Sequence, residues 1–267
     1  MKWFTRFTRI FHRVPRLAVA IDQGKGGSIV LLHGIASSGD AWKPLARQMQ
    51  GEPYRLFAPD LLGFGRSPKP GDASYDVETH MQAVVTALRR GRVKPPYTLV
   101  GHSMGCLVAV HLAARYPRLV ECVILFEPPL FVDIPEFRTH QKRRAQYFKF
   151  FEYIMERPEL ALAQGRAVLR TLRKISGFAL SQDMWTSFER SLRNTIMNQQ
   201  AYRELHDISV RTDIVHGRFD FVVTRADVKE MFTKNKNIHL HVTNRFHGIS
   251  PLSARYLARL IMRLPAE

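Results

Sequence analysis

The chain has 267 residues, enough for one large α/β domain or for a core domain with an insertion. Hydrophobic residues make up 45% of it, which is ordinary for a soluble globular protein with a sizeable core, and no stretch reaches the roughly 20 apolar residues of a membrane span. The formal net charge of +17 suggests nucleic acids or anionic membranes as partners, but the basic residues are spread along the chain without a nucleic-acid-binding motif, so we expect no nucleic-acid partner.

Residues 1–16 form a basic amphipathic segment. Its aromatic and aliphatic side chains fall on one helical face and its arginines largely elsewhere, which is the pattern of an interfacial anchor. Arginines interrupt any apolar run, which argues against a cleaved secretory signal, while an organellar transit peptide and a helix packed on the body of the protein stay open. Cys106 and Cys122 are expected as buried free thiols, which fits a reducing compartment. We therefore expect a cytoplasmic protein that contacts anionic membranes peripherally through residues 1–16.

Strands and helices alternate through most of the chain, which predicts a mostly parallel sheet covered by helices on both faces. The glycine-rich stretch 23–27 between the first two strands predicts a hairpin, and Asp40 is placed to cap the first helix. The predicted strands are 17–22, 28–33, 55–59, 97–101, 122–126, 212–216 and 238–243. The predicted helices are one that runs from Asp40 to residue 49 and those over 75–90, 104–116 and 251–264.

Residues 131–207 interrupt this alternation. Their pattern is helical, with no clear strand, so we expect a core made of 17–130 and 208–267 with a helical cap inserted between its two parts. The cap is rich in aromatic residues, and a subset that includes Trp185 is expected to line an apolar substrate pocket.

The stretch Gly101-His102-Ser103-Met104-Gly105 carries the clearest chemical signal. An apolar strand ends at Gly101 and helical spacing begins at Met104, so Ser103 lies in the strand–turn–helix context of a nucleophile elbow. The two glycines lack the Cβ atoms that would collide in so tight a turn, and Ser103 is expected in a strained backbone conformation. The serine hydroxyl then stands above the sheet edge, next to the positive end of the following helix.

Together with this elbow, four other segments resemble the α/β-hydrolase superfamily, and the resemblance covers nearly the whole chain after residue 17. It is greatest to the capped serine hydrolases: small carboxylesterases, lipases and carbon–carbon bond hydrolases. The resemblance implies an α/β-hydrolase fold, and the serine at the elbow argues against the haloalkane dehalogenase and epoxide hydrolase branches. The segments are HGIASSGDAW (33–42), DLLGFGRS (60–67), GHSMG (101–105), HGRFD (216–220) and FHG (246–248).

A serine nucleophile needs a neutral imidazole to take its proton and a carboxylate to fix the tautomer of that imidazole. On this fold the order along the chain is serine, acid, histidine, and Ser103, Asp220 and His247 match it. Asp220 and His247 each follow a predicted strand, where open α/β sheets place their sites. Glu127, just past the strand before the cap, is the rival acid, because some members of the superfamily carry the acid there.

The resemblance also implies two backbone donors for the oxyanion, the N–H groups of Met104 and Ile35, with Ala36 in place of Ile35 if the loop register differs by one. His102, beside the nucleophile, is expected to line the pocket, and His33 belongs to the structural His-Gly turn. No spacing of histidines or cysteines matches a zinc site, and no phosphate- or dinucleotide-binding pattern is present, so we expect neither a metal nor a cofactor.

The expected function is hydrolysis of a carboxylic ester of a largely apolar small molecule, through a Ser-His-Asp triad and an acyl-enzyme. The first alternative is hydrolysis of a carbon–carbon bond in a diketone-type substrate, which uses the same triad. The second is a non-catalytic binding protein on a hydrolase scaffold. The motifs leave open whether the bond is an ester, a thioester, a lactone or a carbon–carbon bond.

Overall fold

A computed structural model describes residues 14–130, 145, 148–149, 151–159, 180–218, 235–244 and 247–264. The basic segment 1–16 lies outside these residues except for its last three positions, so its predicted helix is not part of the description. Asp220, the predicted acid, also lies outside the described residues.

Within the described ranges, seven strands form one sheet in the order β1-β3-β2-β4-β5-β6-β7. The β1–β3 pair is antiparallel and the other neighbouring pairs are parallel, which confirms the mostly parallel sheet. The strands are β1 (Val19–Gly24), β2 (Gly27–Leu32), β3 (Tyr54–Pro59), β4 (Tyr97–His102), β5 (Val120–Phe126), β6 (Arg211–Gly217) and β7 (Ile238–Thr243).

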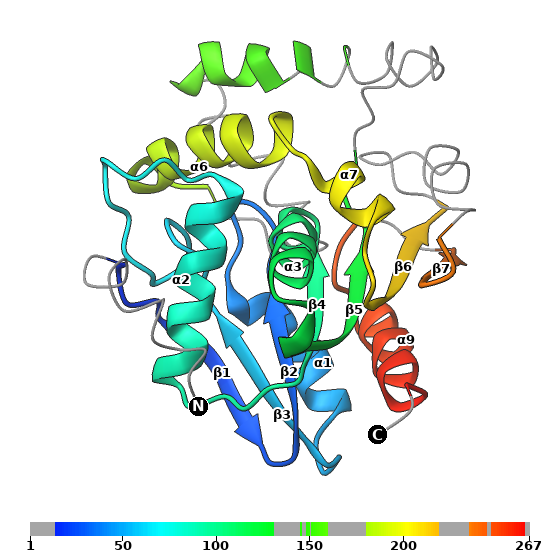
Figure 1. The fold of residues 1–267 in the computed structure, drawn as a ribbon. Coiled ribbons are helices and arrows are strands. Elements are labelled where there is room, and N and C mark those ends of the chain that lie inside the picture. The colour runs from blue at the N-terminus through cyan, green and yellow to red at the C-terminus, as the bar shows by residue number, and fades with distance from the viewer. Residues whose placement is uncertain are drawn as a thin grey trace.

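Helices cover both faces of this sheet, as Figure 1 shows. Side chains of β2 alternate between two cores: Val30 and Leu32 pack with the core under α2 and α3, whereas Ile29 and Leu31 pack with the core under α1 and α9. Burial on both faces is the reason that the central strands are continuous apolar runs. The helices are α1 (Lys43–Gln48), α2 (Val77–Arg90), α3 (Met104–Arg115), α6 (Trp185–Ser191), α7 (Ala201–His206) and α9 (Pro251–Met262), with 3-10 turns η3 (Gly39–Trp42), η4 (Pro117–Leu119) and η5 (Gln182–Met184) and a π-helical turn η6 (Leu192–Met197).

The hairpin predicted between the first two strands is wrong. β1 and β2 are joined by a short turn, but β3 lies between them in the sheet and pairs with both. A Cβ atom added at Gly24 or Gly26 would lie 2.1 Å from a backbone carbonyl oxygen of the chain entering β3, and both glycines have positive φ. The glycines therefore allow a third strand to approach the turn, which a local turn signal does not reveal.

The first helix also begins differently from the prediction. Asp40 does not cap it, because Ser38 is the N-terminal cap of η3 and Asp40 instead forms an ion pair with Lys43 at 3.1 Å. The next helix, α2, begins with a side-chain cap: the Asp76 side chain accepts a hydrogen bond from the Thr79 N–H group.

Between β5 and β6 the described residues include the helices α6 and α7 and the turns η5 and η6, and the helical cap at 131–207 stays a prediction. α6 and η6 are fastened to the loop before α2 by three hydrogen bonds, in which Arg190, Asn194 and Thr195 donate to the backbone carbonyls of residues 73, 74 and 75. None of the helices in the described part of the chain has the length and apolar character needed to cross a membrane.

Candidate active site

Ser103 lies at the turn from β4 into α3, with φ of 50° and ψ of −121°. Its N–H group donates to the carbonyl of Phe126 on β5 at 3.1 Å, which fixes the turn against the neighbouring strand. A Cβ atom would lie 2.2 Å from the Leu32 carbonyl oxygen if added at Gly105, and 2.6 Å from the Cys106 nitrogen if added at Gly101. The predicted strained turn between two obligatory glycines is therefore present.

The His-Gly loop that follows β2 lies directly against this elbow. A Cβ atom added at Gly34 would be 3.1 Å from the Ser103 Cβ atom and 3.3 Å from Nδ1 of His102. Ala36, two residues on, has φ of 50°. The backbone around Ile35 and the first residue of α3, Met104, thus come from two segments that meet at Ser103, the arrangement that a pair of oxyanion donors requires.

His247 follows β7 and precedes α9, and its ring lies beside the ring of His102. The two ring centroids are 5.1 Å apart, and the His102 ring is 5.6 Å from that of Phe126. His102 is adjacent to Ser103 in the chain and its side chain is buried. The structure therefore brings the predicted base to the same edge of the sheet as the predicted nucleophile.

Glu127, the rival acid, follows β5 and has a completely buried side chain and φ of 53°. Its Oε2 atom is 3.5 Å from Nδ1 of His216 at the end of β6, and its N–H group donates to the Val215 carbonyl at 2.9 Å. His216 belongs to the predicted strand 212–216, and its contact with Glu127 was not predicted from the sequence. The signal for the pair was the equivalent position of the two residues at the carboxyl ends of β5 and β6, which are neighbours in the sheet.

Trp185 is the first residue of α6 and is half-buried. Its ring packs against Phe188 on the same helix, with the ring centroids 5.7 Å apart. Its predicted role in lining a substrate pocket stays a prediction.

His33 has the structural role expected of the His-Gly turn. Its Nε2 atom accepts the Leu61 N–H group at 2.8 Å, so its Nδ1 atom carries the proton and donates to the Gly34 carbonyl at 2.7 Å. Burial lowers the pKa of His33 to about 4, against the opposing effects of the Gly34 hydrogen bond and the charge of Asp60. His33 is therefore neutral at pH 7 and acts as a fixed link between two loops.

A buried contact between a histidine and a serine joins His80 of α2 to Ser191 of α6, with Nε2 and Oγ 3.0 Å apart. Burial lowers the pKa of His80 to about 4. Ser191 has ordinary helical dihedral angles, φ of −64° and ψ of −39°, and lacks the strained turn that exposes a nucleophile. This contact therefore joins two helices. Among the described residues, no three or more His, Cys, Asp or Glu side chains are arranged so that they could hold a metal ion. Cys106 and Cys122 are free and buried, which confirms the prediction for these two thiols.

Residues 27–247 match the family model of the alpha/beta hydrolase fold. The chain is 37% identical over 105 residues to "Probable lysophospholipase BODYGUARD 4" of Arabidopsis thaliana, a match that covers 39% of this chain and 25% of that protein. It is 31% identical over 144 residues to "Lipase 1" of Psychrobacter immobilis, which covers 50% of this chain and 45% of that protein. The matches thus span less than half the length of these curated relatives.

Solved structures of low sequence identity share the fold over almost the whole chain. E-2-(acetamidomethylene)succinate hydrolase superposes with a TM-score of 0.70 at 18% identity, and the match covers 92% of this chain and 93% of the hydrolase chain. The esterase EaEST from Exiguobacterium antarcticum superposes with a TM-score of 0.67 at 20% identity, and the match covers 92% of this chain and 94% of the esterase chain. By its family-model match and its sheet, this chain belongs to the alpha/beta hydrolase family.

Proposed function

We propose that this protein is a serine hydrolase that cleaves a carboxylic ester of a largely apolar small molecule, with Ser103 as nucleophile and His247 as base. The observation that carries the proposal is the elbow: Ser103 has positive φ, stands between two glycines that tolerate no Cβ atom, and begins a helix at the carboxyl end of a central strand. The lysophospholipase and lipase relatives support an ester with an apolar acyl chain as the substrate.

In the proposed reaction, Ser103 Oγ attacks the ester carbonyl carbon while its proton passes to the imidazole of His247. The carbonyl oxygen becomes an oxyanion that accepts hydrogen bonds from the N–H groups of Met104 and Ile35. The carbon–oxygen bond to the alcohol then breaks, and the alcohol leaves with the proton from His247. Water attacks the acyl-enzyme, gives one proton to His247 and releases the carboxylic acid, and Ser103 regains its proton.

The acid in this scheme is Asp220, which orients His247 and stabilises its protonated form. Glu127 is the alternative, because it is a buried carboxylate that directly follows the strand next to the elbow. We also propose peripheral contact of residues 1–16 with anionic membranes, which suits an enzyme acting on apolar esters.

Steady-state kinetics on p-nitrophenyl esters of increasing acyl length test the proposal. We expect hydrolysis by the unaltered protein and a fall in kcat of several orders of magnitude, roughly 10⁴- to 10⁶-fold, in Ser103→Ala. Ser191→Ala is the matched control, because Ser191 is a buried serine that contacts a histidine but lies in ordinary helical backbone, and it should retain most of the turnover. Hydrolysis by Ser103→Ala at the rate of the unaltered protein would exclude Ser103 as the nucleophile.

A further inference from the structure

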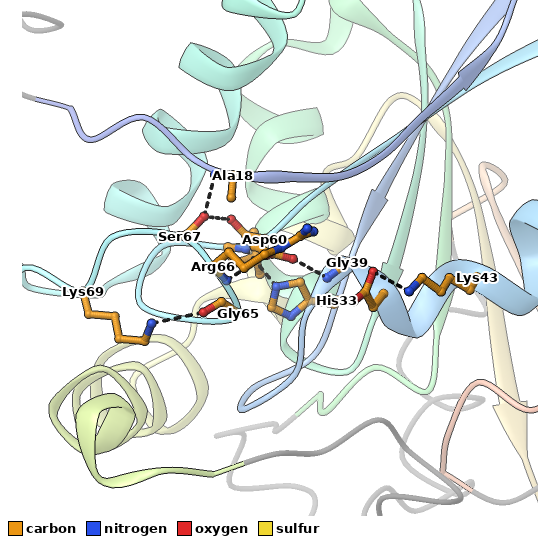
Figure 2. A network of polar contacts seen from close by, with 11 residues as sticks. Ala18, His33, Gly39, Lys43, Asp60, Gly65, Arg66, Ser67 and Lys69 are labelled. Atoms are coloured by element: carbon orange, nitrogen blue, oxygen red, sulfur yellow. Dashed lines mark hydrogen bonds and ion pairs between the residues drawn. The ribbon is translucent and has the colours of Figure 1, made fainter.

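Asp60 is a buried carboxylate directly after β3, at the centre of the polar network in Figure 2. Its Oδ1 atom accepts the Gly39 N–H group at 2.7 Å, and its Oδ2 atom accepts the Arg66 N–H group at 2.8 Å and Arg66 Nε at 3.3 Å. A buried carboxylate is costly unless it is fully hydrogen-bonded. These bonds therefore hold the Asp60 side chain in one orientation, in which Oδ1 binds Gly39 at the end of the His-Gly loop.

Gly65 shows how closely the following loop wraps this carboxylate. A Cβ atom at that position would lie 2.5 Å from Asp60 Cγ, and Gly65 has φ of +54°. The Asp60 carboxylate is thus enclosed by the loop at 61–67 on one side and bonded to Gly39 on the other.

The adjacent residue, Leu61, holds the other end of the His-Gly loop. The Leu61 N–H group donates to His33 Nε2, and His33 Nδ1 donates to the Gly34 carbonyl. Residues 60 and 61 therefore bind both ends of the segment 34–39, one through a carboxylate and the other through a neutral histidine.

Between these two attachments lie the backbone groups proposed as oxyanion donors. Ala36 has φ of 50°, an unfavourable conformation that persists only when its surroundings enforce it. Gly34 contacts Ser103, so a shift of the loop changes the distance between the serine hydroxyl and the N–H groups of Ile35 and Ala36. Oxyanion donors act only within about 2.7–3.1 Å of the developing charge.

We propose that Asp60 is a positioning residue for the oxyanion donors, which holds the Gly39 end of the loop so that the N–H group at Ile35 or Ala36 faces the reacting oxygen. Asp60 contacts no reacting atom and acts through the backbone of residues 34–39. This inference depends on the proposed serine hydrolase function.

Asp60→Asn tests it, because an amide has a single acceptor oxygen, so its NH₂ group must face either the Gly39 N–H group or the Arg66 donors and the side chain can no longer hold both in place. Ser67→Ala is the matched control: the Ser67 hydroxyl donates to the Asp60 carbonyl oxygen and accepts the Ala18 N–H group, so it belongs to the same network but does not bond to residues 34–39. His33→Asn disturbs the other attachment of the loop and serves as an independent second variant.

Three readouts separate positioning from general loosening of the fold. For Asp60→Asn we expect a fall in kcat of roughly 10- to 100-fold and a KM within about 3-fold of that of the unaltered protein. We also expect a matching loss of affinity for a trifluoromethyl ketone, because the oxyanion of its hemiketal with Ser103 accepts hydrogen bonds from the same N–H groups. Ser67→Ala should leave all three nearly unchanged. An unchanged kcat in Asp60→Asn, or equal losses in Asp60→Asn and Ser67→Ala, would overturn the inference.

Hydrogen exchange measured by mass spectrometry on the peptide 34–42 gives a readout that needs no catalysis. We expect faster exchange there in Asp60→Asn and not in Ser67→Ala, and unaltered exchange in both would also count against the inference. If the unaltered protein cleaves no ester while Asp60→Asn loosens the loop, the proposed function fails and the structural part of the inference stands. Should Asp60→Asn fail to fold, Asp60→Ser, which removes the buried charge and the carboxylate acceptors of the Gly39 and Arg66 donors, is judged by the same criteria.

Discussion

At the scale of residues, backbone strain gathers around the elbow. Ser103, Ala36 and Glu127 have φ of 50°, 50° and 53°, and they follow the carboxyl ends of β4, β2 and β5, which are neighbours in the sheet. Such conformations cost on the order of 1–3 kcal/mol each and persist at functional sites where packing enforces them. Three such residues lie at one edge of the sheet, so we expect the functional groups of the protein to be held at this edge.

The acid of the triad is decided by two matched isosteric variants. We expect Asp220→Asn to lower kcat by roughly 10⁴-fold, because an amide in place of the carboxylate leaves the histidine in the wrong tautomer. Glu127→Gln should lower it by less than about 10-fold, since its role would then be limited to contact with His216. The measurement is kcat on a p-nitrophenyl ester, and the reverse ranking of the two variants would make Glu127 the acid.

The glycine after Met104 gives a prediction about stability. Gly105→Ala would place a Cβ atom 2.2 Å from the Leu32 carbonyl oxygen, so β2 and α3 would have to move apart. We expect a loss of at least about 3 kcal/mol in the free energy of unfolding. Gly71→Ala, at a position with no atom within 4 Å, should change it by less than about 0.5 kcal/mol. Urea unfolding compares the two, and similar stabilities would show that the elbow tolerates a side chain.

At the scale of elements, one histidine joins three helices. His111 of α3 contacts Glu78 of α2 through Nε2 at 2.9 Å and Glu204 of α7 through Nδ1. Gln82 and Arg115 also face Glu78, at 2.7 Å and 4.0 Å. Since α7 directly precedes β6 in the chain, this cluster joins the segment that enters β6 to the helices α2 and α3.

The charges of this cluster predict a pH dependence of stability. Burial opposes protonation of His111, but the hydrogen bonds to Glu204 and Glu78 outweigh it and raise its pKa above the ordinary 6.5. The contribution of His111 is thus fully present below pH 6.5 and is lost as the pH rises through its raised pKa. Burial alone would raise the pKa of Glu78, but the hydrogen bonds to His111 and Gln82 lower it overall, so its contribution is lost only in more acidic solution.

Urea unfolding between pH 6 and pH 9 measures this effect. The unaltered protein should lose stability across that range, and His111→Gln, which keeps a polar side chain without the charge, should lose much less. His206→Gln is the control, because His206 is an exposed histidine on α7 whose ring forms an ion pair with the exposed carboxylate of Asp207. A pH profile of His111→Gln that coincides with that of the unaltered protein would refute the role of His111.

At the scale of the whole molecule, local features of the fold could be predicted from the sequence, whereas contacts that depend on the order of strands in the sheet could not. The buried central strands and the elbow were predictable, because continuous apolar runs and the Gly-x-Ser-x-Gly turn are local signals. The pairing of β1 with β3 was not predictable, because glycines in a turn do not indicate which strand packs beside that turn. Glu127 with His216, and Asp60 with Gly39, were missed for the same reason: the partners come from different parts of the chain, 89 and 21 residues apart by their numbers, and meet only in the folded sheet.

The most direct test of the central claim is covalent labelling of Ser103. The protein is treated with a fluorophosphonate, from which an activated serine Oγ displaces fluoride, and the products are analysed by intact mass and peptide mapping. We expect one adduct per chain, located on Ser103, and no adduct in Ser103→Ala. A folded protein that acquires no adduct, or an adduct that maps to another serine and persists in Ser103→Ala, would contradict it.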